Sequence, residues 1–242
     1  MKPIAILNNG SFRRMEAGFF QACGGDQETL FAAASGMPMS AFVAFDIEAG
    51  APLPDPESFC GVILTGSAAM ITDRQPWAEA EAAWVRRHRG KVPMLGVCFG
   101  HQLLTHALGG TVDYTPTGPE YGSSEIALTA DGLADPMFAG MPAQFAVQSA
   151  HSQTATALPA DARLLAAGAS GIQAARFDEH IWGLQFHPEF SAAMMRGLFA
   201  SYRQHYLDQY LDVDQLTLDL RDNAYTFGFV KRFAEHCQSA AA

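Results

Sequence analysis

The chain has 242 residues, of which 49% are hydrophobic and 17% are charged, a composition that is typical of a globular protein and disfavours a disordered one. The chain has 15 Lys and Arg residues and 25 Asp and Glu residues, so its formal net charge is −10. This balance disfavours nucleic-acid binding and docking on anionic membranes, because both need a basic face.

No apolar run in the sequence predicts a membrane span. The longest stretch without charge, 136–160, is interrupted by proline, glutamine, serine and histidine, whereas a span needs about 20 mostly apolar residues. The first apolar run, Ile4–Leu7, is too short for a signal peptide. We therefore expect a cytoplasmic protein without a membrane partner.

Apolar runs alternate with helical patterns through the first 110 residues. Strands are expected at 3–7, 41–47, 61–65 and 92–97, and helices at 26–34, 76–89 and 101–108, the first of these helices with Asp26 as its N-cap. Repeated strand–turn–helix units predict an α/β fold with a mostly parallel central sheet flanked by helices.

The pattern changes after Gly110. Short strands are expected at 123–129, 144–147, 163–168, 172–177 and 181–185, followed by a long helix at 191–211 and a last helix within 216–237. These helices form an expected C-terminal helical extension at about 191–238, and the tail 239–242 is expected to have no regular structure. No linker is recognisable, so we expect a single domain over 1–242.

The four cysteines are scattered without a C-x-x-C pair, at Cys23, Cys60, Cys98 and Cys237. This spacing disfavours a disulfide framework and a zinc site, so we expect free thiols and no metal. Cys98 stands out because it is the centre of Gly96-Val97-Cys98-Phe99-Gly100, where an apolar strand gives way to a helix. Small neighbours on both sides of a sharp strand-to-helix turn are typical of a nucleophile elbow.

Such a turn favours a reactive Cys98. The N-terminus of the following helix stabilises a thiolate by about 1 kcal/mol, and the Phe99 amide can donate to an oxyanion. The alternative is a small buried core cysteine, which the flanking glycines and the position at the carboxyl end of a strand disfavour.

A thiolate nucleophile needs a base, and His187 is the best candidate. It ends an apolar strand just before Pro188, and Glu189 lies two residues on, where extended backbone puts both side chains on one side. A carboxylate there can hold the imidazole tautomer. The alternative is a surface histidine at a capped strand end.

Both segments, Gly96-Val97-Cys98-Phe99-Gly100-His101-Gln102 and Gly183-Leu184-Gln185-Phe186-His187-Pro188-Glu189, resemble the two signatures of class I glutamine amidotransferases. Between them, Gly118-Pro119-Glu120-Tyr121-Gly122, Asp135-Pro136-Met137-Phe138 and Leu158-Pro159 resemble the amidotransferase domain of GMP synthase, in its stand-alone branch. The resemblance implies a flavodoxin-like amidotransferase fold. It also implies that Cys98 attacks the side-chain amide of glutamine, that His187 serves as base and then acid, and that Glu189 orients it.

The resemblance also implies further site residues. Gly66 and Phe99 would form the oxyanion hole, and the substrate-binding residues would be Gln102, Ala150, His151 and Ser152. The family pattern Ser-His-Gly-Asp is replaced here by Ala150-His151-Ser152-Gln153. Ser152 and Gln153 are expected at the rim of the site, where they would admit a substrate larger than glutamine.

The sequence lacks G-x-x-x-x-G-K-[ST] and G-x-G-x-x-G, so we expect no ATP site, no dinucleotide site and no cofactor. The expected partner molecule is glutamine or another γ-glutamyl compound, and any ammonia acceptor would lie on a separate synthetase chain. A γ-glutamyl peptide hydrolase that does not use free glutamine stays open, as does a catalytically silent binding module. A cysteine α/β-hydrolase is disfavoured, since that fold places its acid before its histidine.

Overall fold

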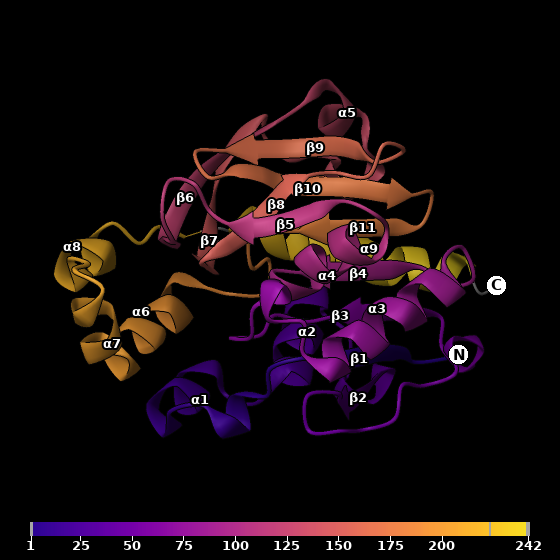
Figure 1. Cartoon of the computed structure of the whole chain (residues 1–242), viewed down its shortest axis with the longest axis horizontal. Helices are drawn as coiled ribbons and strands as arrows, with labels where there is room; N and C mark the ends of the chain where they lie inside the picture. The colour runs from indigo at the N-terminus through magenta and orange to yellow at the C-terminus, as the bar shows by residue number, and fades with distance from the viewer. Residues whose placement is uncertain (1, 223, 241–242) are drawn as a thin grey trace.

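Within the described residues, 2–222 and 224–240, the computed structural model forms a nine-stranded sheet and a two-stranded sheet (Figure 1). One half of the large sheet is parallel and consists, in spatial order, of β2 (Phe42–Asp46), β1 (Ile4–Asn8), β3 (Gly61–Leu64), β4 (Met94–Val97) and β11 (Ile181–Leu184). The antiparallel half continues with β10 (Gly171–Asp178), β9 (Arg163–Gly168), β6 (Glu120–Leu128) and β7 (Gln144–His151). The small sheet pairs β5 (Thr111–Tyr114) with β8 (Gln153–Ala157).

The register of the parallel half determines where the site lies. Gly183 pairs with Gly96, and Leu184 pairs with Val97. Since β4 and β11 are parallel, the segments that follow them leave the sheet at the same edge. Cys98 and the segment leading to His187 therefore emerge side by side.

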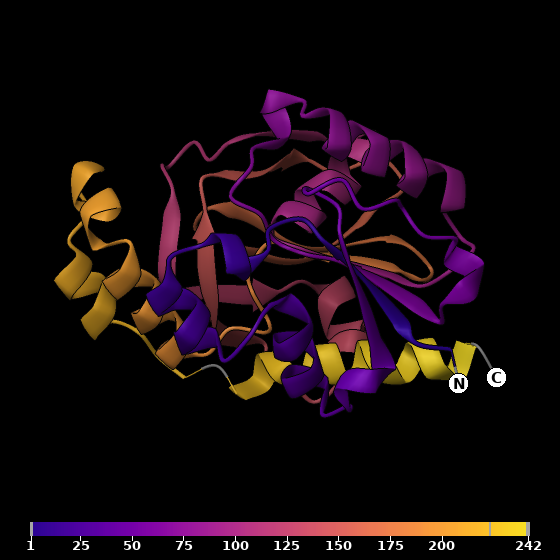
Figure 2. The same ribbon diagram turned by 90° about the horizontal axis from the view of Figure 1, so that it is seen from below.

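Helices cover both faces of the parallel half (Figure 2). One face packs against α2 (Gln27–Ser35) and α9 (Ala224–Ala240), and the other against α3 (Pro76–His88) and α4 (Phe99–Ala107). The alternation along β1 explains this, because Ile4 and Ile6 lie in the first core while Ala5 and Leu7 lie in the second. The α/β class with helices on both faces is confirmed.

A third cluster lies beyond the end of the sheet, where α1 (Ala17–Cys23) packs against α6 (Ala192–Ser201), with α7 (Arg203–Asp208) and α8 (Val213–Leu218) close by (Figure 1). Its buried side chains include Phe12, Phe19, Phe190, Phe199 and Tyr206. The remaining short elements are α5 (Ala130–Ala134) and the 3-10 turns Phe12–Arg14, Met39–Ala41, Pro56–Ser58, Ile71–Asp73 and Pro136–Phe138.

Several predicted boundaries are wrong in the C-terminal part. The helix expected over 191–211 breaks at Tyr202, whose φ of −114° and ψ of 23° are not helical. The last predicted helix is two helices, α8 and α9. Ser239 and Ala240 of the tail belong to α9, whereas Ala241 and Ala242 lie outside the described residues.

The sequence patterns also missed α1, β5 and β8, whereas Asp26 does cap α2 by accepting from the Gln27 amide. In the part of the chain that the structure describes, no helix has the length and hydropathy needed to cross a membrane.

Candidate active site

Cys98 occupies a strained turn between β4 and α4. Its φ of 52° and ψ of −106° are rare for a residue with a side chain, and such a conformation costs on the order of 1–3 kcal/mol. The Cys98 amide donates to the Leu184 carbonyl at 2.8 Å, which holds the turn on β11. A Cβ atom on Gly96 would lie 2.4 Å from the Gly100 carbonyl oxygen, and one on Gly100 would lie 2.1 Å from that of Leu64. Both glycines are therefore required by the close approach of backbone segments.

His187 lies beside this turn and is held from several sides. Its amide donates to the Gln148 carbonyl at 2.8 Å, and its Nδ1 is 2.7 Å from Glu189 Oε1. The imidazole stacks on Phe190 with ring centroids 4.2 Å apart. His187 is 6% exposed and Glu189 is 1% exposed, so this pair is shielded from water.

The surroundings of His187 favour its charged form. Burial lowers the pKa of the imidazole, but the charges of Glu189 and Cys98, and hydrogen bonds to both, outweigh it and raise the pKa to about 10 from the ordinary 6.5. A protonated imidazole beside a sulfur is the arrangement of a thiolate–imidazolium pair.

Gly66 follows β3 and lies directly against the pair. A Cβ atom on Gly66 would be 2.9 Å from His187 Cε1 and 3.6 Å from Cys98 Cβ. The Phe99 amide is at the first position of α4, where a helix offers no acceptor of its own. The structure thus brings both residues of the expected oxyanion hole to Cys98. The predicted start of α4 at His101 is two residues late.

The expected substrate-binding loop lies on the other side of Cys98. The Ala150 carbonyl accepts from the Cys98 sulfur at 3.8 Å, and the Ser152 hydroxyl is 3.3 Å from that of Tyr121. The His151 ring, by contrast, is engaged elsewhere, with Nε2 2.9 Å from Glu120 Oε2 and Nδ1 2.9 Å from the Gln153 carbonyl oxygen. These two hydrogen bonds hold the ring in place, and the ring in turn fixes the position of the His151 backbone.

Glu120 holds the loop around His151 in place. Burial raises the pKa of its carboxyl, but hydrogen bonds from His151, Ser170 and Gln173 outweigh this and lower the pKa to about 2. An ionised carboxylate that accepts several hydrogen bonds is a rigid support for the strand above it.

Gln102 and Gln153 hold backbone segments together. Gln102 Nε2 donates to the Gln153 carbonyl at 2.7 Å and to Gln185 Oε1 at 3.2 Å. The Gln153 side chain accepts from the Ile71 amide at 3.0 Å and donates to the Thr72 hydroxyl at 2.6 Å. Ser152 and Gln153 both line the cavity, as expected of rim residues, and the Gln153 side-chain amide also holds the loop after Gly66 in place.

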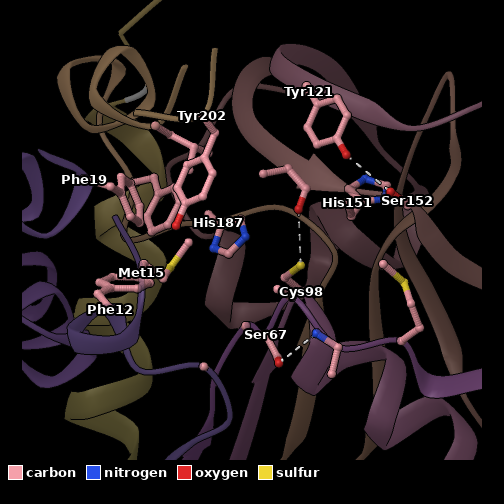
Figure 3. A pocket seen from close by; sticks show the side chains of 18 of the residues that line it. Phe12, Met15, Phe19, Ser67, Cys98, Tyr121, His151, Ser152, His187 and Tyr202 are labelled. Atoms are coloured by element: carbon pink, nitrogen blue, oxygen red, sulfur yellow. Dashed lines mark hydrogen bonds between the residues drawn. The ribbon is translucent and has the colours of Figure 1, made fainter. Parts of the chain in front are cut away.

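A cavity of about 630 Å³ opens over Cys98. Figure 3 shows polar groups of Tyr121, His151 and Ser152 on one side of the sulfur, and Phe12, Met15, Phe19 and Tyr202 on the other side, beyond His187. Sequence reasoning missed these last four residues, whose only signal is the aromatic content of 12–20 and 202–206. Among the described residues, no three His, Cys, Asp or Glu side chains are grouped so as to hold a metal ion.

A side chain at a strand-to-helix elbow beside a buried His–Glu pair, on an α/β sheet, is an arrangement typical of hydrolases. The family model of class I glutamine amidotransferases matches residues 48–200, and the chain belongs to this family. Membership identifies it as an amidohydrolase enzyme.

The most similar curated sequences include two glutamine-hydrolyzing GMP synthases. The one from Thermomicrobium roseum is 40% identical over 129 residues, covering 53% of this chain and 23% of that protein, and the one from Aeropyrum pernix is 34% identical over 132 residues, covering 53% and 24%. The chain thus spans about a quarter of the length of these relatives. A solved glutamine amidotransferase from Thermotoga maritima shares the fold with a TM-score of 0.71 at 20% identity, covering 97% of this chain and 99% of that one.

Proposed function

We propose that this domain hydrolyses a γ-glutamyl amide, with L-glutamine as the simplest substrate, through a thioester on Cys98. The observation that carries the proposal is the triad geometry, with the sulfur at a strained elbow, His187 beside it and Glu189 on Nδ1 of the ring. A catalytically silent module would have no need to maintain this backbone strain and this buried ion pair.

In the proposed reaction, the Cys98 sulfur forms a bond with the γ-carbonyl carbon of the substrate. The negative oxygen of the tetrahedral intermediate accepts hydrogen bonds from the Gly66 and Phe99 amides. The carbon–nitrogen bond then breaks, and the leaving nitrogen takes its proton from the His187 imidazolium. Water, deprotonated by His187, attacks the thioester and releases glutamate and the thiol.

Glu189 acts in this scheme through His187. A carboxylate on Nδ1 fixes the tautomer that presents Nε2 to the sulfur and stabilises the positive ring. The Gln102 carboxamide and the Ala150–Ser152 backbone are proposed to hold the glutamyl group on the polar side of the cavity. A separate synthetase chain is the proposed partner if the released ammonia is used in synthesis.

The test is trapping of the acyl-enzyme. Purified protein is incubated with L-glutamine and hydroxylamine, and we expect glutamate, ammonia and γ-glutamyl hydroxamate. Cys98→Ala is expected to abolish all three, whereas Cys60→Ala, which removes a buried thiol far from the cavity, is expected to leave them unchanged. Product formation by Cys98→Ala at the wild-type rate would contradict the proposal.

A further inference from the structure

The cavity over Cys98 has a second half that a free amino acid does not need. We call it the aromatic lobe and define it by six side chains, Phe12, Met15, Phe19, Leu198, Tyr202 and Tyr206, all of which line the cavity. A volume of about 630 Å³ lies in the range of sites that enclose a drug-sized ligand. Glutamine held at Cys98 would leave the aromatic lobe empty.

Most of the aromatic lobe comes from outside the family region. The family model covers 48–200, so Leu198 alone of the six residues lies within it. The 12–19 segment precedes the matched region, and Tyr202 and Tyr206 follow it. The region matched by the family model thus supplies the triad, while segments outside its bounds supply most of the aromatic lobe.

Close packing gives the aromatic lobe a fixed wall. The Tyr202 hydroxyl accepts from the Glu16 amide at 2.8 Å, which ties the start of α1 to the junction of α6 and α7. A Cβ atom on Gly18 would lie 2.8 Å from the Ser201 hydroxyl oxygen, and one on Gly197 would lie 2.3 Å from Ala22 Cβ. The two helices therefore touch at glycines.

The aromatic lobe lies on the side of the leaving group. His187 stacks on Phe190, and the Phe190 ring centroid is 6.1 Å from those of both Phe12 and Phe19. The general acid of an amide hydrolysis must reach the leaving nitrogen. A substituent on that nitrogen would therefore extend past the imidazole into the aromatic lobe, and the glutamyl group would occupy the opposite, polar side, where Figure 3 shows Tyr121 and Ser152.

The aromatic lobe also selects against charge. Its six residues carry no ionisable group except the tyrosine hydroxyls, and burial raises the pKa of Tyr206 above its ordinary value of 10. Three ionisable residues outside the lobe, Arg14, Glu48 and His205, also line the cavity. Arg14 is paired with Glu48 and Asp46, so it is not offered as a free cation, and His205 is hydrogen-bonded to Gln209 at 2.7 Å.

Building on the proposed function, we propose that the preferred substrates are N-substituted γ-glutamyl amides whose amine carries an aromatic or bulky apolar group. Cys98 sulfur bonds to the γ-carbonyl carbon, the carbon–nitrogen bond breaks, and the amine leaves with the proton of His187. Water then converts the thioester to glutamate, so that one water is consumed for each amine released.

The experiment compares γ-glutamyl ethylamide with γ-glutamyl phenethylamide, which differ by one phenyl ring, alongside glutamine and γ-glutamyl-glycine. We expect kcat/KM for the phenethyl amide to exceed that for the ethyl amide by about tenfold or more, since a phenyl-sized group becomes buried. Met15→Glu places a carboxylate in the aromatic lobe and is expected to bring this ratio close to one. Met15→Leu is expected to restore the ratio, and Met39→Glu, at an exposed methionine outside the cavity, is the matched control.

The outcomes separate the two proposals. Equal kcat/KM values for the phenethyl and ethyl amides, with glutamine turned over, would overturn the inference and leave the proposed function standing. A phenethyl preference that Met15→Glu does not change would overturn the assignment to the aromatic lobe. Failure to hydrolyse any of the four compounds would overturn both.

Discussion

The imidazole of His187 lies flat on the ring of Phe190, with centroids 4.2 Å apart and planes inclined by 13°. Glu189 holds Nδ1 of the same imidazole at 2.7 Å. The carboxylate sets the tautomer of the imidazole and the aromatic ring sets its tilt, so Nε2 has little freedom to leave Cys98. The residues that make this arrangement are consecutive except for Pro188, and Phe190 also forms part of the wall toward the aromatic lobe.

Glu189→Gln is expected to lower kcat by about a thousandfold, because the amide can hold a neutral ring but does not stabilise an imidazolium. In the folded protein Glu189 helps to raise the pKa of His187 to about 10. The proton on His187 therefore stabilises the wild type fully below about pH 6.5, and this contribution is lost as pH rises through about 10.

The corresponding measurement is urea unfolding of wild type and Glu189→Gln between pH 6 and 10. The difference in free energy of unfolding is expected to be largest near pH 6 and to shrink toward pH 10. A difference that grows with pH would show that Glu189 does not stabilise a charged His187.

A glutamine-mimicking electrophile is expected to label Cys98 and to spare the other cysteines. All four thiols are free, but burial raises the pKa of Cys60 and Cys237 and raises that of Cys23 to about 12, so these three stay protonated near neutral pH. Cys98 alone of the four lines the cavity beside an imidazolium. Peptide mass mapping after labelling measures the outcome, and equal modification of all four thiols would argue against an activated Cys98.

The elbow could be predicted because its requirements are local. Gly96 and Gly100 flank Cys98 in the sequence, and the same glycines are the positions where a side chain would collide with backbone. The alternation of apolar runs and helical patterns likewise predicted the parallel strands, whose carboxyl ends bring Cys98 and His187 together.

The aromatic lobe could not be predicted because it depends on packing between distant segments. The helix α1 contains Gly18 and has no side-chain cap at Glu16, so its local pattern is weak. Tyr202 interrupts the long helical pattern without a glycine or proline to mark the break, and its hydroxyl is held by the Glu16 amide. The strand β5 was missed because it is short and mostly exposed, so it has no apolar run.

Glu120→Gln is expected to destabilise the protein by about 3 kcal/mol near neutral pH, given the 1.4 kcal/mol that accompany each unit of pKa. The pKa of Glu120 is lowered to about 2 by His151, Ser170 and Gln173, so its carboxylate stabilises the folded state above about pH 4.3. That contribution is lost as pH falls through about 2, where the wild type becomes protonated as well.

Urea unfolding at pH 7, 4 and 2.5 measures this effect, and the difference between wild type and Glu120→Gln is expected to decrease along the series. Asp131→Asn, at an exposed carboxylate, is the matched control. A constant difference at all three pH values would mean that Glu120 acts through its shape and not through its charge.

The last prediction concerns activity of the chain by itself. An amidotransferase that depends on a partner has a misaligned triad when alone, and the partner raises turnover by shifting the population of the competent state. Here the residues of the proposed triad are already together, with Nδ1 of His187 on Glu189, and Gly66, proposed for the oxyanion hole, lies so close that a Cβ atom on it would be 2.9 Å from His187 Cε1. The Glu120–His151 and Gln102–Gln153 hydrogen bonds also hold the loop around His151 in place without help from another chain.

We therefore expect steady-state turnover of γ-glutamyl amides by the purified chain, with no added protein. The check is the rate of glutamate release from glutamine and from the phenethyl amide, measured with and without a glutamine-dependent synthetase that lacks its own amidotransferase domain. A rate that the synthetase leaves unchanged is the expected result, and glutamine turnover that begins only when the synthetase is added would establish the chain as a subunit.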